Sequence, residues 1–148
     1  MDVQPDFKEL LASFNAHDVA YVIVGGYAVA FHGAPRLTGD MDIFVKPDLT
    51  NARRILDALE EFGFGSVGLQ TKDFEAADNV VQFGVPPVRV DIMTSVTGVS
   101  WDEVYSGRAE GKYGDVLVSY IGREQLLANK RALGRKRDLA DLEALGVE

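Results

Sequence analysis

The stretch from residue 20 to residue 46 constrains the fold most, because segments typical of different secondary structures follow one another there. An apolar, β-branched run has the composition of a strand buried on both faces. Gly25 and Gly26 then form a turn without side chains, and a segment long enough for a short helix follows. Asp40 and Asp42 open a second run that alternates as a strand does. The stretch therefore predicts a strand, a glycine turn, a helix and a second strand.

Segments typical of helices and of strands also alternate along the rest of the chain. Apolar residues recur at helical spacing in several segments, and shorter apolar runs are bounded by glycine or proline. We therefore expect an α/β (α+β) fold, a single domain over residues 1–148 with a mixed β-sheet flanked by helices. Helices are expected at 5–15, 27–32, 49–62, 123–133 and 136–145, strands at 20–24, 40–45, 79–83, 88–94 and 116–121, a short helix or loop at 101–107, and a short strand or loop within 64–77.

Composition narrows the class of function. The 148 residues carry a net charge of −8, which argues against broad nonspecific binding to DNA or RNA, since such binding depends on lysine and arginine. The chain has no cysteine, so a disulfide, a thiolate metal site and a cysteine nucleophile are all excluded. No apolar run approaches the roughly 20 residues that span a bilayer, and no signal peptide is evident at the start. We expect a soluble, cytoplasmic protein.

Asp40 and Asp42 are the first candidates for a metal site. They are two positions apart on a predicted strand, so their side chains leave the same face. Neighbouring carboxylates repel unless a positive charge lies between them, and Mg²⁺ prefers such oxygen ligands. The alternative is that both are solvated residues at the end of a strand.

Asp91 is the third candidate, because it lies in the middle of the otherwise apolar predicted strand 88–94. A charge buried there must be paired or bind a metal. Pairing with Arg89 or Arg36, or an open solvent-facing position, are the alternatives. If this strand lies beside the strand of Asp42, three carboxylates converge, which suits a two-metal site. Asp91 could then also accept the proton of an attacking hydroxyl.

Gly25 and Gly26 are candidates for binding phosphate through the backbone, since a helix is expected directly after them. A tight turn with a purely structural purpose is the alternative. Arg36 could neutralise phosphate or hold the loop through a carboxylate, and the two roles are weighed equally. For His32, at the end of a short apolar helix, a structural role is favoured over proton transfer.

The segment 123–137 is rich in lysine and arginine although the chain is acidic. For most of these basic residues we expect solvated helix faces. For Lys130 we favour contact with nucleotide phosphates, and Arg135 is a second candidate. Asp138 and Asp141 are expected to form salt bridges that fix the two closing helices.

Together these residues resemble the nucleotidyltransferase superfamily, whose fold is the palm of DNA polymerase β. Within it the chain is similar to the minimal nucleotidyltransferase branch, which includes toxins of abortive-infection systems. The resemblance covers about residues 5–145 and rests on Gly25-Gly26-Tyr27-Ala28, Phe31-His32-Gly33, Pro35-Arg36, Thr38, Asp40, Asp42, Asp91 and the tail 130–142.

The resemblance implies transfer of a nucleoside monophosphate from a nucleoside triphosphate (NTP), with ATP as the expected donor and Mg²⁺ as the cofactor. It implies Asp40, Asp42 and Asp91 as metal ligands and Gly25-Gly26 at the triphosphate. Many members carry Gly-Ser where this chain has Gly25-Gly26, so a hydroxyl contact to phosphate is missing here. The chain has no obvious second domain for an acceptor, which implies a partner protein, an RNA end or a small molecule held at the surface.

Two other hypotheses compete with an enzyme. One is a catalytically weak nucleotide-binding module of the same fold, such as one half of a toxin–antitoxin pair. The presence of all three carboxylates favours the enzyme over this module. The other is a metal-independent structural protein, which requires the glycine pair and the three aspartates to coincide by accident.

Overall fold

The computed structural model describes residues 3–35, 39–62, 68–84 and 88–147. The helices are α1 (Pro5–Ala16), α2 (Gly25–Phe31), α3 (Leu49–Phe62), α4 (Lys72–Glu75), α5 (Trp101–Ser106), α6 (Arg123–Leu133) and α7 (Lys136–Ala144). The strands are β1 (Tyr21–Val24), β2 (Asp40–Val45), β3 (Val80–Phe83), β4 (Arg89–Met93), β5 (Ala109–Tyr113) and β6 (Val116–Tyr120). The predicted α/β fold with a mixed sheet is confirmed.

The six strands form one sheet in the order β3-β4-β2-β1-β6-β5. β1 runs antiparallel to β2 and parallel to β6, and β2 runs parallel to β4. The hairpins β3–β4 and β5–β6 form the two edges. Every residue of the central strand β1 is buried, as its continuous apolar run predicts.

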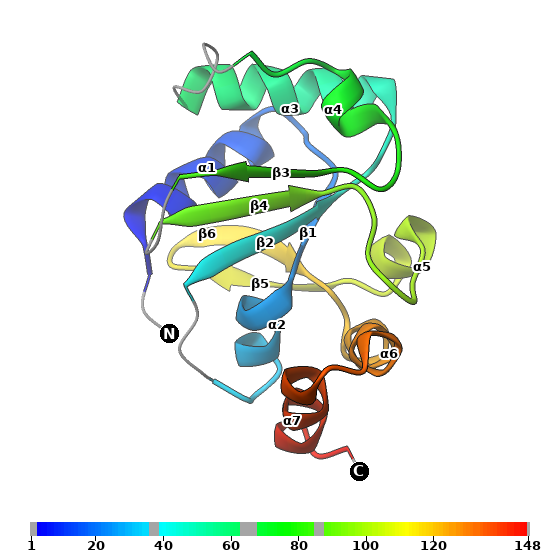
Figure 1. The fold of residues 1–148 in the computed structure, drawn as a ribbon. Helices are drawn as coiled ribbons and strands as arrows, with labels where there is room; N and C mark the ends of the chain where they lie inside the picture. Colours follow the sequence, from blue (N-terminus) through cyan, green and yellow to red (C-terminus); the bar gives the residue numbers. More distant parts are fainter. Residues whose placement is uncertain (1–2, 36–38, 63–67, 85–87, 148) are drawn as a thin grey trace.

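Helices lie on both sides of this sheet (Figure 1). The view shows α3 and α4 beyond the β3 edge and α2, α6 and α7 together on the opposite side, near the C-terminus. α1 and α3 are joined by a buried hydrogen bond in which Ser13 Oγ donates to the carbonyl oxygen of Ala58 at 3.0 Å. The apolar faces of α1 and α3 are largely buried, so this pair closes one part of the core.

Two elements differ from the sequence-based expectations. The segment 72–75 is the short helix α4 instead of a strand or loop; Phe74 is fully buried there, and Asp73 Oδ2 accepts from the Gln70 backbone N–H at 2.8 Å. β5 was not expected, because the sequence Ala-Glu-Gly-Lys-Tyr lacks strand patterning. It forms because the adjacent β6 pairs with all five of its residues.

The expected helix-or-loop at 101–107 is the helix α5. Ser100 and Glu103 form a capping box at its start, in which each side chain binds the backbone N–H of the other. Within the described part of the chain, no helix combines the length and the apolar character needed to cross a bilayer.

Candidate active site

The carboxylates predicted to form a site lie on adjacent strands. Asp42 on β2 and Asp91 on β4 are direct partners in the parallel register, and Asp40 is the partner of Arg89. Side chains that are partners in a register leave the same face of a sheet. The pairing of these two strands, which was the condition for convergence of the carboxylates, is therefore met, and it places all three aspartates on one face.

Arg89 shares that face and binds two of the three carboxylates. Its Nε and Nη2 atoms donate to the two oxygens of Asp91 at 3.2 and 3.1 Å, and Nη2 lies 3.5 Å from Oδ2 of Asp40. The ion pair between Asp91 and Arg89, which the sequence left open as an alternative, is thus formed. It explains how Asp91, only 8% exposed, is accommodated in an apolar strand.

The expected convergence of three carboxylates is met only in part. No group of three or more histidine, aspartate or glutamate side chains within the described ranges is arranged so that it could hold a metal ion. The cation that the chain itself places beside Asp91 and Asp40 is the Arg89 guanidinium. Which residues bind a metal ion therefore stays a prediction.

Asp42 has unfavourable surroundings for a charged carboxylate. Burial, reinforced by the negative charges of Asp91 and Asp40, raises its pKa to about 6, although Lys130 and Arg89 act in the opposite direction. Gly25 lies against this carboxylate with a φ of +69°, and a Cβ there would overlap Oδ2 of Asp42. A glycine is thus required at position 25 both by the backbone angle and by the space.

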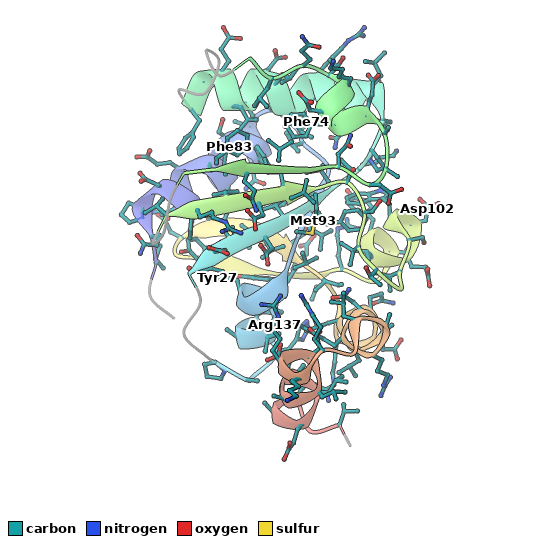
Figure 2. The ribbon with its side chains drawn as sticks, in the orientation of Figure 1. Tyr27, Phe74, Phe83, Met93, Asp102 and Arg137 are labelled. Carbon is teal, nitrogen blue, oxygen red and sulfur yellow. The ribbon has the colours of Figure 1, made fainter. Side chains whose placement is uncertain are left out.

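A cavity of about 500 Å³ opens over the carboxylates, within the size range of small-ligand sites. Figure 2 labels Met93 and Arg137, which line it from β4 and α7. The sheet and the α2 turn contribute Val24, Gly25, Gly26, Gly39, Asp40, Asp42, Arg89, Asp91 and Met93, the loop after β4 contributes Ser95, Val96 and Thr97, and the closing helices and their junction contribute Asn129, Lys130, Leu133, Arg135 and Arg137. One wall is therefore acidic and the facing wall is basic.

Lys130 lies in this basic wall but is only 4% exposed. Its Nζ atom is 2.9 Å from Oδ2 of Asp141 and 3.4 Å from Oδ1 of Asp138. Asp138 is fully buried and also receives three hydrogen bonds from Arg135 at the start of α7. The expected salt bridges of Asp138 and Asp141 are confirmed, and they hold Lys130 at the cavity.

The loop after β4 closes the side of the cavity next to α6. Asn129 Nδ2 donates to the carbonyl oxygen of Thr97 at 2.8 Å. Gly98, with a φ of +85°, packs so closely on α6 that a Cβ would press against Ala132. This docking fixes the loop on the helix that carries Lys130.

The remaining candidate residues lie in different surroundings. His32 Nε2 donates to the carbonyl oxygen of Ile121 at 2.7 Å, which agrees with the favoured structural role. Gly26 lines the cavity, whereas Arg36 lies outside the described residues. Sequence reasoning did not name Asn129 or Arg137 as cavity residues, and it named Arg89 only as a partner of Asp91. The signal for Arg89 was the alternation of β4, which puts it on the face of Asp91.

Asp40 and Asp42 are the side chains on this face that could hold a divalent cation such as Mg²⁺. Asp40 and Asp42 offer carboxylate oxygens on one face, and the pKa of Asp42 is raised mainly by burial and further by the charges of Asp91 and Asp40. The absence of a side chain at Gly25 lets the Asp42 carboxylate pack directly against the backbone of the turn before α2. Asp91 is already engaged by Arg89.

Comparison of the sequence with protein-family models and with curated proteins gives no match. Several solved structures share the fold, and two of them illustrate its class. One is a candidate nucleotidyltransferase, TM1012 from Thermotoga maritima, with a TM-score of 0.64 and 15% identity over 96% of this chain and 93% of that one. The other is the lincosamide antibiotic adenylyltransferase LnuA in its lincomycin-bound form, with a TM-score of 0.57 and 16% identity over 99% of this chain and 98% of that one. The chain therefore has a nucleotidyltransferase-type fold.

Proposed function

We propose that the protein is a Mg²⁺-dependent nucleotidyltransferase that moves a nucleoside monophosphate from an NTP, with ATP as the expected donor, to an acceptor. The observation that carries this proposal is the pairing of Asp42 with Asp91 beside Gly25, in a cavity whose opposite wall holds Lys130. An acidic wall suits a metal ion, and a basic wall suits the phosphates that accompany it. The fold shared with an adenylyltransferase is consistent with this chemistry.

Each residue has a defined task in the proposed reaction. Asp40 and Asp42, with Asp91 beside them, would hold the ion, which when bound supplies positive charge to the triphosphate. Gly25 and Gly26 leave the adjoining wall free of side chains, so phosphate can approach the backbone. Lys130 attracts phosphate oxygens from the far wall.

The chemical step is an in-line displacement at the α-phosphorus of the donor. The acceptor oxygen or nitrogen forms a new bond to that phosphorus, the bond to the β-phosphate oxygen breaks, and pyrophosphate leaves. The acceptor proton passes to Asp91, whose carboxylate Arg89 holds in a fixed orientation. The acceptor we expect is a partner protein, an RNA or a small hydroxyl or amine compound, and the reaction is expected to occur in the cytoplasm.

Transfer is tested with the four NTPs, each labelled at the α-phosphate, incubated with the purified protein and a cell lysate. The expected result is label on an acceptor with at least one NTP, lost in Asp42→Asn and on addition of EDTA. The label is then located by protease, nuclease and size separation, which distinguishes the three acceptor classes. No transfer from any of the four donors would contradict the enzyme.

The alternative is a catalytically weak nucleotide-binding module, such as one partner of a toxin–antitoxin pair. The observation in its favour is the engagement of Asp91 by Arg89, which occupies the carboxylate proposed to take the proton. Calorimetric titration with ATP and Mg²⁺ separates the two functions. Binding that is lost in Asp42→Asn, combined with no transfer from any NTP, would identify the module.

A further inference from the structure

We propose that the Arg89 guanidinium is a permanent cation of this site, in the place of a second metal ion, so that the site takes a single divalent ion. The inference rests on the proposed function and makes it more specific. A site formed by three converging carboxylates suits two metal ions. Here the Arg89 side chain already neutralises Asp91 on its own strand and, in part, Asp40 on the neighbouring strand.

The contacts of Arg89 resemble those that a bound cation would make. Nε and Nη2 reach both oxygens of Asp91, so the pair is bidentate, and Nη2 also approaches Asp40. The planar fork of a guanidinium matches a carboxylate in this geometry. Arg89 thus bridges the two carboxylates that flank Asp42 in the structure.

The register of the sheet fixes Arg89 in this position. Arg89 is the direct partner of Asp40 and precedes Asp91 by two residues on the same strand face. The Asp91 side chain is only 11% exposed, so water cannot readily replace the guanidinium. Because arginine stays protonated at any physiological pH, the cation is present in every state of the site.

The position of this charge determines where a metal ion can bind. An ion bridging Asp91 and Asp40 would lie next to the guanidinium and be repelled by it. The Asp42 carboxylate makes no hydrogen bond or ion pair with Arg89, and it lines the cavity next to Gly25. One ion on Asp42 and Asp40 is therefore compatible with Arg89, and a second ion on Asp91 is not.

The number of bound ions tests the inference directly. The protein is dialysed to equilibrium against Mn²⁺ and α,β-methylene-ATP, which cannot transfer its nucleotide, and the Mn²⁺ retained per bound nucleotide is counted. We expect one Mn²⁺ for the wild type and for Arg89→Lys, which keeps the charge. We expect two for Arg89→Gln, which removes the charge and frees Asp91.

Arg108→Gln is the matched control, because it removes the same charge elsewhere. Arg108 lies 3.9 Å over the ring of Tyr105 and does not line the cavity. It should retain one Mn²⁺ per nucleotide. Circular dichroism establishes that each variant is folded before the count is made.

Two results would overturn the inference: a count of two in the wild type, or a count of one in folded Arg89→Gln. The wild-type count decides by itself if Arg89→Gln does not fold. A wild type that retains nucleotide with two ions would refute the role of Arg89 and leave the proposed function intact. A wild type that retains neither nucleotide nor Mn²⁺ would refute both.

Discussion

Asp42 and Asp91 face each other across the parallel strands β2 and β4, although they come from distant parts of the chain. This pair is the centre of the candidate site, since Asp40, Arg89 and Gly25 are all arranged around it. A half-buried carboxylate beside a buried one raises the energy of the ionised state. We therefore expect the ionised carboxylates to destabilise the protein when no cation is bound, and a bound cation to remove this destabilisation.

Asp42→Asn should stabilise the metal-free protein at neutral pH. The pKa of Asp42 is raised from 3.8 to about 6 in the folded protein. Below pH 3.8 the group is neutral in both the folded and the unfolded state and does not lower the stability. As the pH rises through 6 the folded protein must carry the unfavourable charge, and this stability is lost. At pH 7.5 the substitution should raise the free energy of unfolding by about 1–3 kcal/mol, because each pKa unit corresponds to roughly 1.4 kcal/mol. Urea unfolding in EDTA measures it, and the gain should vanish near pH 4.

The control for this measurement is Asp57→Asn, which changes an exposed carboxylate on α3 and should leave the stability unchanged. A lower free energy of unfolding for Asp42→Asn than for the wild type at pH 7.5 would contradict the strained state of Asp42.

Gly25→Ala should abolish nucleotide binding and lower the stability. The new Cβ would overlap Oδ2 of Asp42, and a φ of +69° is unfavourable for alanine. The unfavourable backbone conformation lowers the free energy of unfolding by about 1 kcal/mol, and displacement of the Asp42 carboxylate lowers it further.

Gly33→Ala is the matched control, because Gly33 also has a positive φ but no atom within 4 Å of the added Cβ. Calorimetric titration with ATP and Mg²⁺ should show binding in the control only; equal binding by both variants would refute the requirement for space at Gly25.

Lys130→Met should weaken ATP binding by about 10-fold or more, since one charge–phosphate contact contributes roughly 1.5–3 kcal/mol. The substitution also leaves Asp141 without its buried lysine partner. The double variant Lys130→Met/Asp141→Asn restores the charge balance and separates folding from binding. We expect the double variant to fold and still to bind ATP weakly.

Lys136→Met removes a charge from an exposed position at the start of α7 and serves as the control. It should bind ATP as the wild type does. Recovery of full binding in the double variant would show that Lys130 acts only through the fold.

Asp138→Asn should destabilise the protein by about 2–4 kcal/mol at pH 7, because a buried ion pair loses one partner. Burial acts to raise the pKa of Asp138, but hydrogen bonds from Arg135 and the charge of Lys130 outweigh it and hold this pKa at about 2. The stabilisation is therefore present above pH 3.8 and lost as the pH falls through 2. The difference from the wild type should shrink over that window in urea unfolding.

Asp115→Asn offers a contrasting salt bridge for that experiment. Asp115 pairs with Lys8 at the surface, with 79% of its side chain exposed, so its loss should have little effect. A loss of stability in Asp138→Asn no greater than that in Asp115→Asn would refute the structural role of the buried cluster.

The local patterns of the sequence were sufficient for most helices and strands. The apolar run before Gly25 predicted β1, and alternation placed Asp40 and Asp42 on one face of β2. These predictions succeed because backbone periodicity depends on residues close together in the chain. β5 was not predicted, because its five residues carry no such pattern and form a strand only by pairing with β6.

The sequence by itself determined which residues could do the chemistry: a glycine turn, two aspartates on one strand, a third on another, and a lysine near the end. Tertiary structure alone decided how they meet. The parallel register of β2 and β4 makes Asp42 the neighbour of Asp91 and puts Arg89 within reach of both Asp91 and Asp40. The buried partners of Lys130 hold it at the same cavity from the other wall. Strand register and helix docking arise from contacts between distant segments, which no local pattern encodes.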